Sequence, residues 1–229
     1  RMRTRMRNER RLITIEEPMP PISEAYRVLR TNRQFSAIDQ AMQVIAVTSA
    51  QPREGKTTTI SNLAVAYAQD GKRVMLIDAD LRKPTLHRVF ARTNRKGLTN
   101  VLANISTLED EMQATDVDQL FLLTSGPMPP NPAEILATKR MGMLLDELRQ
   151  QFDVILIDTP PALALTDAQV IASRSDGVLL VVSSGKTKRD LIRKCKANLE
   201  YVNANLLGVV LNNQNRREAE SYYYYYQYK

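Results

Sequence analysis

The residues best suited to chemistry lie in the segment Ala50–Thr58, which has the sequence Ala-Gln-Pro-Arg-Glu-Gly-Lys-Thr-Thr. The segment follows an apolar run and opens a helical pattern, so consecutive backbone N–H groups and a helix N-terminus are expected to converge on phosphate oxygens. Gly55 allows close approach of the backbone, Lys56 is expected to reach the β- and γ-phosphates, and Thr57 to bind Mg²⁺. Together with Thr58, these residues predict a binding site for ATP with magnesium. The segment departs from the pattern GxxxxGK[ST] only at its first position, where alanine replaces glycine.

Three carboxylates follow apolar runs of strand type and are candidates for metal binding or proton transfer. Asp78 and Asp80 end the run that begins at Val74, and side chains spaced i, i+2 on a strand point to one face. Two carboxylates that close would raise one pKa, but a divalent cation between them keeps both ionised. Asp158 ends another such run, at the place expected for a Walker B aspartate that orders Mg²⁺ through water.

From Gln43 onward, short β-branched apolar runs alternate with longer helical stretches, which is typical of βαβ units around a parallel sheet. Most runs are continuously apolar, as expected for strands covered by helices on both faces. We therefore predict an α/β fold of the P-loop NTPase type. The expected strands are Val44–Thr48, Arg73–Ile77, Leu120–Leu123, Val154–Ile157, Gly177–Val182 and Leu206–Leu211. The expected helices are Lys56–Gln69, Ala133–Gln151, Asp167–Ser173 and Lys188–Val202, with Ile22–Phe35 as a separate amphipathic helix.

Length and charge favour one domain with short tails. At 229 residues and 43% hydrophobic content the chain can bury a substantial core. We expect a basic arm over residues 1–20, a P-loop domain over 21–215 and a disordered tyrosine-rich tail over 216–229. Six arginines within the first eleven residues supply most of the formal charge of +7. This local excess argues against nucleic-acid binding and fits a solvated tail, a docking segment for an acidic partner or a contact with anionic lipid.

The sequence gives no sign of a membrane span or a leader. No apolar run approaches the roughly 18 residues needed to cross a bilayer, and the arginine-rich start lacks a following apolar stretch. We therefore expect a cytoplasmic chain.

Two of the motifs carry a resemblance to a known family. The segment Asp78-Ala-Asp-Leu-Arg82 has the DxDxR spacing of a Walker A′ motif, and Ser125–Glu134 has the form SGPxPPNPxE. With these motifs added to the P-loop, the sequence resembles the bacterial tyrosine kinases of capsule and exopolysaccharide synthesis. An Asn-Pro pair can start any helix, so the second motif has weight only beside the first.

Two further segments fit the same family. Glu24, Arg27 and Arg30 resemble its ExxRxxR oligomerisation motif, and the chain ends in a cluster that resembles its autophosphorylation tail. The tyrosines of this cluster are Tyr222, Tyr223, Tyr224, Tyr225, Tyr226 and Tyr228. The plainer alternatives are an ordinary i, i+3 ion pair on a helix surface and a sticky disordered tail.

The resemblance implies an ATP-dependent protein-tyrosine kinase whose subunits form a ring, an octamer in the family's arrangement, and phosphorylate one another's tails. In this scheme Lys56 absorbs charge that develops on the transferred phosphoryl group, and a carboxylate takes the tyrosyl proton. We assign that base to Asp78, although an exchange of roles between Asp78 and Asp80 stays open.

The remaining site residues are also assigned by resemblance. Thr57, Asp80 and Asp158 are expected to hold magnesium and its water. A residue at the end of the last strand, Asn212 or Asn213, is expected near adenine. Arg82 either braces its loop or reaches phosphate, and it stays unassigned.

The resemblance further implies partners and a location. The Gram-positive arrangement has a separate transmembrane activator that supplies a cytoplasmic tail, which would recruit the chain to the inner face of the plasma membrane. A cognate tyrosine phosphatase and other cytosolic protein substrates are expected as well. Six phosphates would add roughly −10 charge to the tail, so phosphorylation is expected to dissolve the ring.

The main alternative is a Min- or Par-type ATPase switch, which would have nearly the same folded core. Those proteins carry a characteristic lysine at the second position of the loop, where this chain has Gln51. A catalytically inactive scaffold is a third possibility, and the presence of Lys56, Thr57 and all three carboxylates argues against it.

Overall fold

The structure is a computed structural model that describes residue 12, residues 21–36 and residues 42–214 of the chain. Its centre is a seven-stranded sheet with the order β3-β4-β2-β5-β1-β6-β7. The strands are β1 (Val44–Ser49), β2 (Val74–Asp78), β3 (Gln113–Ala114), β4 (Leu120–Leu123), β5 (Val154–Asp158), β6 (Gly177–Ser183) and β7 (Leu206–Asn212). Neighbouring strands are parallel, except that β3 pairs antiparallel with β4. The six predicted strands are confirmed to within one residue at either end, and the two-residue β3 is an addition.

The helices alternate with the strands, as predicted. They are α2 (Pro21–Ser36), α3 (Lys56–Gln69), α4 (Leu86–Val89), α5 (Leu98–Leu102), α6 (Leu108–Glu111), α7 (Pro132–Ala137), α8 (Lys139–Gln151), α9 (Asp167–Ala172) and α10 (Arg189–Tyr201). We did not predict α4, α5 and α6, because helices of four or five residues are shorter than the two turns over which a helical period becomes visible.

The predicted helix Ala133–Gln151 is wrong as a single element. The chain is extended at Thr138, with φ −62° and ψ 156°, and this residue ends α7 and precedes α8. The Thr138 hydroxyl donates to the Ile135 carbonyl at 2.8 Å, and such local bonds compete with helix continuation. Gly142 lies inside α8 without interrupting it.

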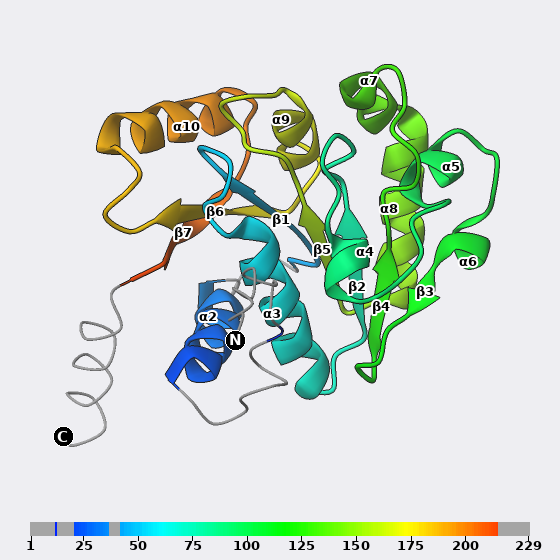
Figure 1. The fold of residues 1–229 in the computed structure, drawn as a ribbon, viewed down its shortest axis with the longest axis horizontal. Coiled ribbons are helices and arrows are strands. Elements are labelled where there is room, and N and C mark those ends of the chain that lie inside the picture. Colours follow the sequence, from blue (N-terminus) through cyan, green and yellow to red (C-terminus); the bar gives the residue numbers. More distant parts are fainter. Residues whose placement is uncertain (1–11, 13–20, 37–41, 215–229) are drawn as a thin grey trace, which may run out of the picture.

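Two hydrophobic layers enclose the sheet, one on each face. In β1, Val44 and Ala46 belong to one layer whereas Ile45 and Val47 belong to the other, as the two-residue period of a strand requires. Helices α3 and α4 contribute to the second layer, and α5 to α10 to the first. Figure 1 shows α3 on one side of the sheet and α7 to α10 around the other. The predicted cover on both faces is therefore confirmed, and the edge strand β7 is only partly buried.

Helix α2 packs against α3 outside the sheet (Figure 1). Arg30 holds the two helices together, because its Nη1 donates to the Ala66 carbonyl at 3.1 Å and lies 3.3 Å from Asp70 Oδ1. Tyr26 packs at the same interface and is 9% exposed. The P-loop helix thus carries α2 on its outer side.

The remaining expectations about the chain ends lie outside this structure. The basic arm, apart from residue 12, and the tyrosine tail fall on residues that are not described, so their boundaries stay predictions. Among the helices of the described residues, none has the length and apolar character to cross a bilayer.

Candidate nucleotide and phosphotransfer site

The loop between β1 and α3 has the backbone of a phosphate cradle. Arg53 and Gly55 have positive φ of 66° and 94°, and α3 starts at Lys56 directly after Gly55. No described side chain caps this helix, so its first N–H groups stay available for an anion. A Cβ on Gly55 would lie 1.8 Å from Asn212 Nδ2, which explains why glycine is needed here. The loop therefore fits the polyphosphate of a nucleotide.

The Walker-type pair of hydroxyl and carboxylate is assembled as the sequence suggested. Thr57 Oγ1 donates to Asp158 Oδ2 at 2.6 Å, although the residues are 101 positions apart. Thr57 is 6% exposed and Asp158 1% exposed, so the pair lies beneath the loop. A hydroxyl bonded to a carboxylate at the start of the P-loop helix is the donor set that holds Mg²⁺ in this class of site.

Asp78 lies next to Asp158 in the register of β2 and β5. Its Oδ2 accepts the backbone N–H groups of Thr85 and Leu86, both at 2.9 Å, and its Oδ1 accepts that of Asp80 at 3.2 Å. Burial, and then the charge of Asp158, raise the pKa of Asp78 to about 7, against the opposing effect of the backbone donors. The carboxyl group is therefore rigidly held and has a high proton affinity for an aspartate.

Asp80 lies just beyond the end of β2, in the loop that follows the strand. Its Oδ1 accepts the backbone N–H of Lys83 at 3.0 Å, and the residue is 8% exposed. Arg82, which was unassigned, forms two hydrogen bonds to the buried Asp167, from Nε at 3.0 Å and from Nη2 at 3.3 Å. Arg82 therefore braces the loop, which is one of the two roles considered for it.

Glu54 is a site residue that the sequence analysis missed. Its carboxylate is 3% exposed, accepts the Gln51 N–H at 2.9 Å through Oε2 and accepts the Thr187 hydroxyl through Oε1. The Asn212 amide donates to the Glu54 carbonyl at 2.9 Å. The phosphate loop is thus tied to the loop after β6 and to the end of β7. A glutamate directly before Gly-Lys-Thr was a visible signal, but its partner lies 133 residues away.

The two asparagines predicted near adenine lie at the same edge. Asn213 Nδ2 donates to Ser183 Oγ at 3.0 Å, and the Asn212 carbonyl accepts the Ser184 N–H at 2.8 Å. These bonds fix the end of β7 against the end of β6, beside the phosphate loop. Contact with a base stays a prediction.

Metal binding at this site cannot rest on carboxylates alone. Within the described ranges, no three His, Cys, Asp or Glu side chains gather closely enough to hold an ion by themselves. Mg²⁺ prefers few protein ligands, with water and phosphate oxygens completing its octahedron. The Thr57 and Asp158 pair fits this coordination preference, and Asp80 is the other predicted ligand.

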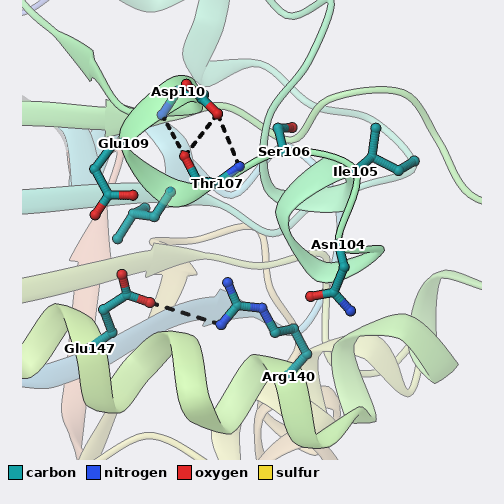
Figure 2. A pocket seen from close by; sticks show the side chains of 9 residues that line it. Asn104, Ile105, Ser106, Thr107, Glu109, Asp110, Arg140 and Glu147 are labelled. Atoms are coloured by element: carbon teal, nitrogen blue, oxygen red, sulfur yellow. Dashed lines mark hydrogen bonds and ion pairs between the residues drawn. The ribbon is translucent and has the colours of Figure 1, made fainter.

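A surface cavity of about 420 Å³ includes none of these residues in its lining. Figure 2 shows the side chains that line it. It lies between α6, the turn before it and α8, where Arg140 and Glu147 approach to 3.9 Å. Thr107 and Asp110 are bonded to each other in a capping box at its rim. No predicted site residue lines it, and the bonded pair Thr107 and Asp110 serves the start of α6.

The predicted oligomerisation residues differ in exposure: Glu24 and Arg27 are partly exposed, and Arg30 is largely buried. Arg27 Nη1 lies 3.2 Å from Glu24 Oε2, and both side chains are about one-third or more exposed, at 32% and 44%. Arg30 is 18% exposed and holds α2 on α3. Only the first pair therefore presents its charged groups outward.

Comparison with known proteins identifies the family to which the chain belongs. Residues 42–206 match the family model described as "AAA domain". The Bacillus subtilis (strain 168) protein named "Tyrosine-protein kinase YwqD" is 48% identical over 206 residues, which cover 90% of this chain and 87% of the relative. The chain belongs to the bacterial tyrosine kinases.

Other similar proteins support the assignment of this chain to the tyrosine kinase family. The Staphylococcus aureus protein named "Putative tyrosine-protein kinase CapB" is 38% identical over 197 residues, 86% of each chain. The crystal structure of "the chimerical protein CapA2B2" has a TM-score of 0.86 at 43% identity and covers 90% of each chain. The kinase domain of Escherichia coli ETK has a TM-score of 0.87 at 32% identity, with coverage of 94% of this chain and 86% of that one.

A Min-type protein is similar in fold alone. The septum site-determining protein MinD from Pyrococcus horikoshii has a TM-score of 0.64 at 23% identity. The tyrosine kinase therefore has the P-loop NTPase architecture predicted for it, and the kinase family is distinguished by the higher identities.

Proposed function

We propose that this tyrosine kinase transfers the γ-phosphoryl group of ATP to the tyrosines of its own tail, from one subunit to the next. The single observation that carries the proposal is the pair Thr57 and Asp158, buried under an uncapped helix start with Asp78 alongside. The acceptor is the cluster of residues 222–226 and 228.

The protein's part in the transfer is to position and neutralise the phosphates. The first N–H groups of α3 and the loop backbone bind phosphate oxygens, and Lys56 balances charge on the β- and γ-phosphates. Thr57, Asp158 and Asp80 would hold Mg²⁺, which would supply charge neutralisation at the phosphoryl group. The tyrosyl oxygen approaches in line with the bond that breaks.

Asp78 is proposed to receive the tyrosyl proton. Its carboxyl group is oriented by three backbone N–H donors and lies beside the Thr57 and Asp158 pair. It must be ionised to accept the proton, and a cation held by the neighbouring Asp158 and Asp80 would favour that form. If the roles were exchanged, Asp80 would be the base and Asp78 would serve the metal.

The assembly is proposed from the exposed pair on α2. Glu24 and Arg27 present charge to a neighbouring subunit in a ring, while Arg30 fixes α2 to the P-loop helix. A membrane activator with a cytoplasmic tail, a tyrosine phosphatase and other cytosolic substrates complete the proposal, together with a role in capsular or exopolysaccharide synthesis at the inner membrane face.

The deciding experiment is intact mass spectrometry of the phosphatase-treated chain after incubation with ATP and Mg²⁺. Wild type is compared with Lys56→Met and with a variant in which all six tail tyrosines are changed to Phe. We expect a ladder of added phosphates in wild type and none in either variant. A wild type that releases inorganic phosphate without gaining mass would instead indicate an ATPase switch. A Phe variant that keeps the ladder would move the acceptor site elsewhere.

A further inference from the structure

On the loops around the site, exposed and buried charged side chains differ in sign. On the loops that follow β1, β2 and β6, the exposed side chains that carry charge are all cationic, and the acidic ones are buried. The exposed cations are Arg53, Arg82, Lys83, Lys186 and Lys188. The buried acids of the same loops are Glu54 and Asp80, at 3% and 8% exposure.

Four of these cations lack a counterion among the described residues. Arg82 is paired with Asp167, whereas Arg53, Lys83, Lys186 and Lys188 form no ion pair within residues 21–36 and 42–214. We call these four residues the cationic rim. Unpaired exposed charges of one sign create a field that attracts an anionic partner within about a Debye length, roughly 8 Å at physiological salt.

Hydrogen bonds hold the rim around the phosphate loop. The Thr187 hydroxyl donates to Glu54, which fixes the segment between Lys186 and Lys188 against the loop. On the other side, the Lys83 N–H donates to Asp80 and the Thr85 hydroxyl lies 3.4 Å from the Thr57 hydroxyl. The rim cations therefore lie on loops that border the phosphate loop.

The tail offers no net attraction before it is modified. Residues 216–229 contain three basic and two acidic residues besides the tyrosines. Each phosphate adds about −1.5 to −2 charge, so a single transfer makes the tail anionic. In an extended peptide, residues two apart are separated by about 7 Å, so a phosphotyrosine lies close to the tyrosine that occupies the site.

We propose that the cationic rim binds phosphotyrosines already present on the tail of a second copy of this chain, so that the first phosphate favours the next transfer. The inference rests on the proposed function and names what that site recognises beyond a tyrosine hydroxyl. Each step moves one phosphoryl group from ATP to a tyrosyl oxygen, releases ADP and passes the phenol proton to the carboxylate base.

The test is a binding measurement that does not depend on turnover. Two fluorescent peptides cover residues 216–229, one with phosphotyrosine in place of Tyr222 and one with Tyr222→Phe. Their dissociation constants are measured by anisotropy on the full chain with ADP and Mg²⁺, after its six tail tyrosines have been changed to Phe. We expect the phosphopeptide to bind about tenfold more tightly at low salt, with the advantage falling as salt rises.

Matched variants test whether the tighter binding of the phosphopeptide depends on the cationic rim. Lys186→Gln with Lys188→Gln should reduce the advantage to about twofold or less, and Lys194→Gln with Lys196→Gln, exposed on α10, should leave it intact. Equal binding of the two peptides, or an advantage that the rim variant keeps, would overturn the proposal. Weaker ADP binding with unchanged peptide binding would also overturn it, because the rim would then serve the nucleotide.

Failure of the parent proposal would look different. If the same protein, supplied with the activator's cytoplasmic tail, transferred no phosphate from ATP to either peptide, the kinase function assigned to this site would be refuted. The binding comparison would still decide for or against the rim.

Discussion

At the scale of single residues, Gly55 concentrates two constraints at one position. Its φ of 94° is a conformation that side chains with a Cβ rarely adopt, and a Cβ there would lie 1.8 Å from Asn212 Nδ2. The nearest atom is the end of a side chain that could move, but that amide also holds the Glu54 carbonyl. A substitution therefore distorts the phosphate loop and loosens its tie to β7.

We predict that Gly55→Ala weakens ATP binding by about fivefold or more while the chain stays folded, since strain of this kind costs about 1–3 kcal/mol. Isothermal titration with an ATP analogue measures the affinity, and circular dichroism checks the fold. Adding Asn212→Ala removes the clash but not the strained φ, so the double variant should recover affinity only in part. Full affinity in the single variant would contradict the argument.

At the residue level, the sequence could name candidate site residues only where the chemistry is local in sequence. Lys56 and Thr57 follow from one short motif, and the carboxylate of Asp158 follows from the end of an apolar strand. The bond from Glu54 to Thr187 was not predictable, because it depends on which loops the strand order places side by side. Arg82 could be narrowed to two roles, and only the position of Asp167 decided between them.

At the scale of elements, α2 depends on Arg30 for its attachment to α3. We predict that Arg30→Ala lowers the free energy of unfolding by about 1–2 kcal/mol, because a half-buried charged hydrogen bond and an ion pair are lost together. Arg27→Ala should cost less than about 1 kcal/mol, as expected for an exposed pair. Urea unfolding of dilute protein measures both. Equal losses would show that the two arginines do not divide their roles as proposed.

Asp176 directly precedes β6 and connects it to the start of β1 and to α8. Its Oδ2 accepts the N–H groups of Gln43 and Val44, both at 2.8 Å, and Arg149 of α8 donates to both of its oxygens at 2.6 and 2.7 Å. Burial alone would raise the pKa of Asp176, but these donors outweigh it and hold the pKa below the ordinary value of 3.8. The ionised form is therefore the one that stabilises the fold.

We predict that Asp176→Asn destabilises the chain by about 1–3 kcal/mol at pH 7. A depressed carboxyl pKa contributes stability above the unfolded value and loses it as pH falls through the folded value. The difference between wild type and variant should thus be constant from pH 7 to about 5 and shrink below about pH 4. Urea unfolding across this range provides the measurement, and a difference that grows in acid would contradict the sign.

Helices and strands with a clear hydrophobic period were predictable from the sequence, and very short ones were not. The strands β1, β2, β5 and β6 are continuously buried and apolar, so their existence and parallel class followed from composition. The break at Thr138 left no signal of its own, because both flanking segments have helical patterns. The strand order, which brings β1 between β5 and β6, was likewise left open by the sequence.

At the scale of the whole molecule, the rim and the tail set a limit to how much phosphate an assembly can hold. Four rim cations balance about two phosphates, at about −2 each. Six phosphates would add roughly −10 and take the chain from its formal +7 to about −3. Beyond the second phosphate, added charge is uncompensated and faces the like charge of neighbouring tails.

We therefore predict that the subunits stay associated with one or two phosphates each and separate as the number rises, because repulsion between tails then exceeds the attraction to the rim. Native mass spectrometry of fractionated phosphoforms reports the oligomer and the phosphate count together. Loss of the rim through Lys186→Gln and Lys188→Gln should move dissociation to a lower count, because the attraction that offsets the first phosphates is then removed. A fully phosphorylated chain that keeps the size of the unmodified oligomer would contradict this account, whereas an unmodified chain that never associates would refute the ring itself.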